Sequence, residues 1–169
     1  SDNWWDTVSL SLRLGNNITW CYAENKEATR NMILNNSYFL WLGPQGDWGY
    51  PMSVDGNIFH TQDIVFMLES CKFSNPNTFE EAMAIRSFSI MKPYMMCYDK
   101  SILVGVPHNI VQDTHPNNKS TQKHTAPYLN SLYLDGCQID MRMFDGLECN
   151  SVHCEQNYVM EEMKTVAVS

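Results

Sequence analysis

The stretch TVSLSLRL at residues 7–14 alternates apolar and polar side chains. A period of two residues is typical of a strand that is buried on one face and exposed on the other. Outward from it, Gly-Asn-Asn at 15–17 is a turn signal, and apolar runs at 18–22 and 38–42 predict two further strands. The polar residues 23–36 between these runs predict a loop or a frayed helix.

Helical patterns follow a loop that is rich in Gly and Pro. Residues 43–51 (GPQGDWGYP) contain too many of these two residues for a regular element. Residues 61–70 then group their apolar side chains on one helical face and begin at Thr61, a candidate N-cap. Thr78 and Glu81 have the spacing of a capping box and predict a second helix.

The remaining sequence mixes both kinds of element. Residues 94–98 and 102–106 are short apolar runs that predict buried strands, and 115–124 are polar and predict a mobile loop. Residues 126–134 predict a helix with Pro in its first turn, and Gly136 follows its end. We therefore expect α/β structure, a mixed α+β segment, in one domain or segment over residues 1–169.

Composition limits the partners and the compartment. The chain has 169 residues, a net charge of −8 and a pI near 4.9, which argue against nucleic acid and anionic membranes as main partners. No apolar run is long enough for a membrane span. The six Cys form no C-x-x-C pair, and 11 Met with frequent Asn favour an intracellular chain with free thiols, so we expect a cytoplasmic protein.

Several catalytic signatures are absent from the sequence. It contains no G-x-S-x-G, no Walker loop and no G-x-G-x-x-G, which disfavours serine hydrolases and phosphate-loop enzymes. The densest polar and aromatic region is 46–59, where Asp47, Trp48, Tyr50 and Asp55 suit a carbohydrate, because rings stack on sugars and carboxylates accept hydroxyl hydrogen bonds. The alternative is a structural turn in which Trp48 is a plug.

His153 is a candidate ligand for a divalent cation. It stands beside Glu155, and imidazole and carboxylate suit Mn or similar metals. The alternative is a hydrogen-bonded structural histidine. The other histidines show no ligand spacing to one another: His60, His108, His115 and His124.

Taken in order, a series of short segments resembles a group of bacterial and viral glycosyltransferases. The segments are 9–15, 47–51, 53–59, 75–77 with Glu80 or Glu81, 97–101, 107–112 and 150–155. The resemblance implies the GT-A fold, a Rossmann-like α/β sandwich. It also implies transfer of a hexose from a nucleotide-sugar donor to a glycan or protein-linked acceptor, with Mn or Mg bridging the diphosphate.

The same resemblance implies a role for each matching residue. Asp55 would be the catalytic carboxylate at the acceptor hydroxyl, either as general base or as hydrogen-bond acceptor. His153 would lie on the metal or the diphosphate. Four residues would line the acceptor side: Asp47, Trp48, Tyr50 and Gly56.

One departure from the family pattern changes what we expect of this chain. GT-A enzymes carry an Asp-x-Asp pair for the metal and the donor, and no Asp-x-Asp occurs here. Together with the absence of Met at position 1, this predicts the acceptor-side, C-terminal portion of a longer enzyme, incomplete and inactive in isolation. Two rivals stay open: a non-catalytic carbohydrate-binding domain, and a glycoside hydrolase using Asp47 and Asp55.

Overall fold

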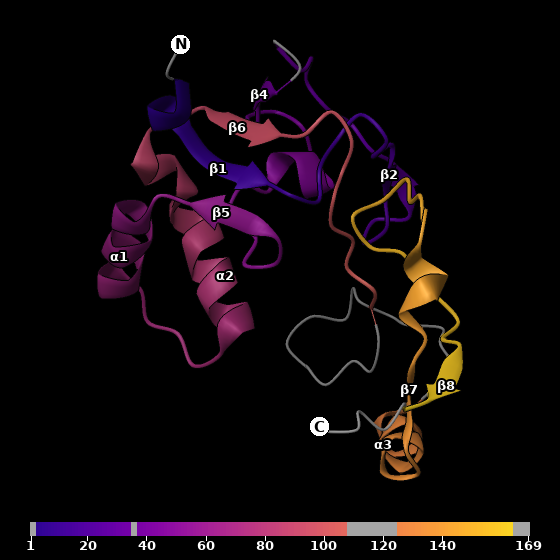
Figure 1. The fold of residues 1–169 in the computed structure, drawn as a ribbon. Helices are drawn as coiled ribbons and strands as arrows, with labels where there is room; N and C mark the ends of the chain where they lie inside the picture. Colours follow the sequence, from indigo (N-terminus) through magenta and orange to yellow (C-terminus); the bar gives the residue numbers. More distant parts are fainter. Residues whose placement is uncertain (1–2, 35–36, 108–124, 164–169) are drawn as a thin grey trace, which may run out of the picture. The chain divides into compact units, whose positions relative to one another are not determined.

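A computed structural model describes residues 3–34, 37–107 and 125–163 (Figure 1). The chain forms two compact units, one of Ser1–Gly105 with Cys149–His153 and one of Val106–Glu148 with Cys154–Ser169. The loop expected at 115–124 lies outside the described residues. All of the candidate site residues belong to the first unit.

A four-stranded mixed sheet organises the first unit, and its strand order is β4-β6-β1-β5. The strands are β1 (Thr7–Ser11), β4 (Tyr38–Leu40), β5 (Asn57–Phe59) and β6 (Tyr94–Cys97). β1 pairs parallel with β6 and antiparallel with β5, and β4 pairs antiparallel with β6. The mixed α/β class predicted from the sequence is confirmed at this level.

β1 is buried on both faces, so the prediction of a half-exposed strand is wrong. Val8 lies in the hydrophobic core, but Ser9 and Ser11 of the polar phase are also buried. β1 lies between β6 and β5, and the polar side chains Ser9 and Arg13 bond to Pro51 and Ser53 of the loop before β5. Ser9 Oγ donates a hydrogen bond to the Pro51 carbonyl at 2.9 Å, which satisfies one of these buried hydroxyls.

Two helices lie on one side of this sheet (Figure 1). They are α1 (Thr61–Ser70) and α2 (Pro76–Arg86), and the short η3 (Ser87–Ile90) continues the chain after α2. Met67 of α1 and Met83 of α2 are buried in the same apolar cluster as Val8 and Met95 of the sheet. The bounds predicted for α1 are confirmed.

The helix starts differ from the predicted caps. His60, not Thr61, is the N-cap of α1, and its side chain makes no capping bond. The capping box of α2 is formed by Asn75 and Thr78 rather than by Thr78 and Glu81. The Asn75 side chain accepts from the Thr78 backbone N–H, which places Pro76 at the first helical position, where its missing N–H costs nothing.

Two predicted strands are much shorter in the structure. Only Trp20–Cys21 (β2) is extended in the run 18–22, paired with Lys26–Glu27 (β3). The Trp20 N–H donates instead to the Asn150 carbonyl. In the run 102–106 only Gly105 pairs, in an isolated bridge with His153.

Residues 43–51 do contain a short regular element. Gly46–Gly49 form the 3₁₀ turn η2, which holds Asp47 and the buried Trp48. A second short 3₁₀ turn, η1 (Asn3–Asp6), precedes β1. The sequence did not predict η2 because Gly and Pro in this stretch indicate an irregular loop, although η2 itself contains two glycines and lies between Pro44 and Pro51.

The second unit contains one helix and a small hairpin. Its elements are α3 (Ala126–Leu134), β7 (Cys137–Ile139), η4 (Met141–Phe144) and β8 (Met160–Glu162), with β7 and β8 antiparallel. α3 has the predicted bounds, and Thr125 Oγ1 caps it by accepting from the Tyr128 N–H. Across the described ranges, no helix combines the length and the apolar character needed to cross a bilayer.

Candidate functional site

Arg13 pairs with one of the predicted site residues, Asp55, and its charge acts on two others, His153 and Asp47. We call Arg13, Asp47, Asp55 and His153 the Arg13 cluster. Arg13 follows β1, Asp47 lies in η2, Asp55 lies in the turn before β5, and His153 lies at the bridge with Gly105. The charges of Arg13, Asp47 and Asp55 all act on the His153 ring, so the four side chains form one electrostatic unit.

Arg13 is the buried centre of this cluster. Its side chain is 9% exposed, its Nη1 donates to Asp55 Oδ2 at 3.1 Å, and its Nη2 donates to Ser53 Oγ at 2.7 Å. Ser53 Oγ also accepts from the Asp55 backbone N–H at 3.3 Å. Arg13 and Ser53 therefore fix Asp55 from its side chain and from its backbone.

Asp55 combines this fixed position with access to solvent. Its side chain is 52% exposed although its Oδ2 is held by Arg13. Glu80 Oε2 accepts from the neighbouring Val54 N–H at 2.8 Å, which anchors the turn to α2. A carboxylate that is held at one oxygen and half exposed suits hydrogen bonding to a hydroxyl of a ligand.

Gly56 supports Arg13 instead of standing open to a ligand. Its φ of +71° is in the left-handed region, which favours glycine. A β-carbon there would lie 2.8 Å from Arg13 Cγ, and the Gly56 carbonyl accepts from the Leu12 N–H at 2.8 Å. The role that the sequence suggested, acceptor binding, is not visible in these contacts.

His153 is held between a backbone bridge and an aromatic ring. The Gly105 N–H donates to the Val152 carbonyl at 2.8 Å, and the Tyr22 ring meets the imidazole edge-on with centroids 6.0 Å apart. Burial and then the Arg13 charge lower the pKa of His153, while Asp47 and Asp55 act to raise it. The imidazole is therefore neutral at neutral pH.

Asp47 is the most shielded carboxyl of the cluster. Burial raises its pKa, and the charges of His153 and Arg13 oppose that rise. Its contact with the Cys21 thiol is a hydrogen bond, and burial followed by the Asp47 charge raises the pKa of Cys21. Asp47 Oδ2 is buried and has no hydrogen-bond partner among the described residues.

Trp48 belongs to the core. Its side chain is 0% exposed, its Nε1 donates to the Ile18 carbonyl at 3.3 Å, and Phe39 meets it edge-on at 4.8 Å. This arrangement matches the alternative reading of Trp48 as a plug, and the ring offers no face to a sugar in this conformation. Tyr50 is half-buried, and burial together with its hydrogen bond to Glu80 raises its pKa.

The cluster does not by itself make a metal site. Across the described parts of the chain, no three His, Cys, Asp or Glu side chains converge as ligands. Arg13 also places a positive charge beside both Asp55 and His153, which opposes a second cation there. The binding of Mn or Mg at His153 stays a prediction.

Sequence reasoning missed two residues of the site, Arg13 and Gly105. Arg13 stands in the polar phase of the 7–14 alternation, where nothing distinguishes it from an exposed residue. Gly105 could have been predicted, because a glycine inside an apolar, strand-like run often marks a position that another group approaches closely.

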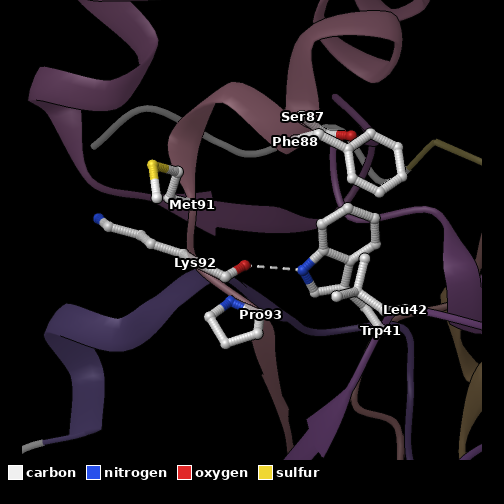
Figure 2. A pocket seen from close by; sticks show the side chains of 7 residues that line it. All are labelled: Trp41, Leu42, Ser87, Phe88, Met91, Lys92 and Pro93. Atoms are coloured by element: carbon white, nitrogen blue, oxygen red, sulfur yellow. Dashed lines mark hydrogen bonds between the residues drawn. The ribbon is translucent and has the colours of Figure 1, made fainter.

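An apolar pocket of about 250 Å³ lies elsewhere in the first unit (Figure 2). It is lined by Trp41, Leu42, Ser87, Phe88, Met91, Lys92 and Pro93. Trp41 Nε1 donates to the Lys92 carbonyl at 2.8 Å, and the Trp41 and Phe88 rings are 5.1 Å apart. None of the predicted site residues lines it, and it lacks the carboxylates of the Arg13 cluster.

Comparison with known proteins identifies no relative: no family model, no curated protein and no solved structure matches this chain.

Proposed function

We propose that this chain is the acceptor-side segment of a glycosyltransferase. The reaction moves a hexose from a nucleotide-sugar donor to a hydroxyl of a glycan or protein-linked acceptor. The observation that supports it best is the Arg13 cluster, in which the buried Arg13 holds the half-exposed Asp55 while its charge also acts on His153 and Asp47. Groups whose pKa is shifted by burial together with nearby charges occur often at functional sites, and Asp47 and His153 are two such groups.

Asp55 is the group that acts on the acceptor in this proposal. It accepts the hydrogen bond of the acceptor hydroxyl and takes its proton as the oxygen forms the new bond to the sugar carbon. The bond from that carbon to the nucleoside diphosphate breaks in the same step, and the diphosphate leaves with the electron pair. A general base must lie within hydrogen-bond reach of its proton, and half of the Asp55 side-chain surface is open to such a hydroxyl.

Arg13 and His153 serve Asp55 in two ways. Arg13 holds one carboxylate oxygen, so the group does not have to be ordered when the acceptor arrives. The neutral His153 imidazole supplies a second hydrogen-bonding group near Asp55 without adding positive charge. Asp47 is more deeply placed than Asp55 and acts on His153 through its charge.

Asp55→Asn tests the proposal, with transfer measured on the polypeptide encoded by the native gene and a panel of nucleotide sugars. The substitution keeps the shape and removes the base, so we expect a loss of about 10²–10⁴-fold in transfer rate with little change in donor affinity or in Tm. Asp6→Asn, at an exposed position of η1, is the matched control and should transfer normally. Near-normal turnover by Asp55→Asn would remove Asp55 from the mechanism.

A non-catalytic carbohydrate-binding domain is the second candidate function. The half-exposed Asp55 favours it equally, because a fixed carboxylate also binds sugar hydroxyls without chemistry. Burial of Trp48 weakens it, since the proposed stacking platform is enclosed in the core. Glycan binding that depends on Asp55, in the absence of transfer to any acceptor by the native polypeptide, would support the binding domain over the transferase.

A further inference from the structure

Gly105 lies next to both His153 and Asp55. A β-carbon on Gly105 would lie 2.6 Å from His153 Nδ1, 3.1 Å from His153 Cε1 and 3.3 Å from Asp55 Oδ2. Distances below 3.0 Å are not found for real β-carbons, so a side chain at this position must displace the imidazole. Both candidate functional groups therefore lie next to the position that a β-carbon on residue 105 would take.

The reason for glycine here is space and not backbone conformation. Five other glycines have positive φ, namely Gly43, Gly46, Gly56, Gly136 and Gly146, and Gly105 is not one of them. An alanine can therefore adopt the Gly105 backbone without strain. What excludes it is the pair of side chains that face this position.

Neither neighbour can move away freely. The backbone of His153 is tied to the Gly105 segment by the bridge, and Tyr22 lies against its ring. Asp55 Oδ2 is held by Arg13 at 3.1 Å, so a shift of the carboxylate would weaken that ion pair. A methyl group on residue 105 would consequently rotate the imidazole or loosen Asp55.

We infer that Gly105 is a positioning residue, which lets the His153 imidazole and the Asp55 carboxylate act together on one ligand hydroxyl. This inference rests on the proposed function for the role of the pair, but the placement of the two side chains is tested independently of it. Misplacing a reacting group by about 1 Å can cost about a hundredfold in rate.

Gly105→Ala is the central variant, and it is measured on the native polypeptide in three ways. We expect acceptor binding or transfer to fall by about tenfold to a hundredfold. We also expect the His153 ring resonances in ¹H–¹³C NMR spectra to shift, and Tm to fall only slightly. The matched control is Gly136→Ala, which strains a positive φ with no atom within 4 Å of the added methyl and belongs to the second unit. It should lower Tm and leave the His153 resonances and the activity per folded molecule unchanged.

A double variant separates positioning from general destabilisation. His153→Ala removes the ring that the Gly105→Ala methyl would strike, so adding Gly105→Ala to it should cost little further activity or thermal stability. Additive losses in the double variant, or unchanged His153 resonances in Gly105→Ala, would overturn the inference. If the wild type neither binds nor transfers sugars, the proposed function fails, and the NMR and stability comparisons still decide whether Gly105 leaves the space that the His153 imidazole occupies beside Asp55.

Discussion

Replacing Arg13 with Met perturbs the centre of the Arg13 cluster while changing its packing little. Met keeps an unbranched apolar chain beside Gly56, which contacts the Arg13 stem. It removes the guanidinium, and with it the hydrogen bonds to Ser53 Oγ and Asp55 Oδ2. The consequence is measurable both in stability and in the titration of His153.

The expected loss of stability follows from the exposure of the two partners. The buried bond to Ser53 is charge-assisted and contributes about 1.5–2 kcal/mol, at the lower end of such bonds. The bond to Asp55 adds about 0–1 kcal/mol, because that side chain is 52% exposed and water takes over the carboxylate. A total near 2 kcal/mol lowers Tm by about 4–8 °C for a chain of 169 residues.

Urea denaturation and an NMR titration of His153 are the assays for this variant. The Arg13 charge lowers the pKa of His153, whereas Asp47 and Asp55 raise it, so removing Arg13 should move the titration midpoint upward. Arg142→Met is the control, because Arg142 is 74% exposed and pairs with Asp140 and Glu161 in the second unit. An unchanged His153 midpoint, or a loss of stability no larger than that of Arg142→Met, would refute this account of the cluster.

Four further predictions concern the same unit and the chain in isolation. The pKa of folded His153 is below the ordinary 6.5, so the unfolded chain binds the extra proton and stability falls as the pH drops below about 6.5; His153→Gln should flatten this slope in Tm measured against pH. Asp47 has the opposite sign, because its folded pKa is above the ordinary 3.8 and stability falls as the pH rises through that window; Asp47→Asn should therefore raise Tm at neutral pH, and a lower Tm would contradict the assignment. Trp48→Ala should cost about 3–5 kcal/mol in chemical denaturation, as expected for a buried aromatic side chain, and a loss below about 1 kcal/mol would return Trp48 to the list of ligand contacts. The isolated 169-residue chain should show no tight binding of UDP- or GDP-sugars with Mn in calorimetry, since it has no Asp-x-Asp, and micromolar binding would contradict its description as an acceptor-side segment.

Local sequence patterns predicted the helices well. α1 and α3 have the bounds that apolar spacing, Pro and Gly indicated, because hydrogen bonds within a helix join residues that are close in the sequence. The cap of α2 was misassigned for a local reason, since Asn75 and Thr78 compete with Thr78 and Glu81 for the same geometry. The sequence alone therefore does not show which of these two capping boxes forms.

Long-range contacts were the limit for the strands and the site. The run 102–106 has the composition of a buried strand, yet Ile102 and Leu103 both donate to the Leu12 carbonyl and only Gly105 pairs with His153. Nothing near residue 102 in the sequence specifies those partners. The sequence placed Trp48 in a region rich in polar and aromatic residues. Its enclosure by Ile18 and Phe39 depends on the fold, because both residues are distant from Trp48 in the sequence or come from another element.

The sequence by itself determined that the chain is a mixed α/β protein with a net negative charge, and it singled out Asp47, Asp55 and His153 by residue type and local context. The tertiary structure decided that His153 and Asp55 lie beside the same residue, Gly105, and that Arg13, from the polar phase of the 7–14 alternation, is buried and paired with Asp55. The physical reason is that the chemistry of each side chain follows from its residue type alone. Burial and charge interactions depend instead on which distant segments of the chain the fold brings together. Gly105 shows this most directly, because its lack of a side chain has meaning only beside His153 and Asp55.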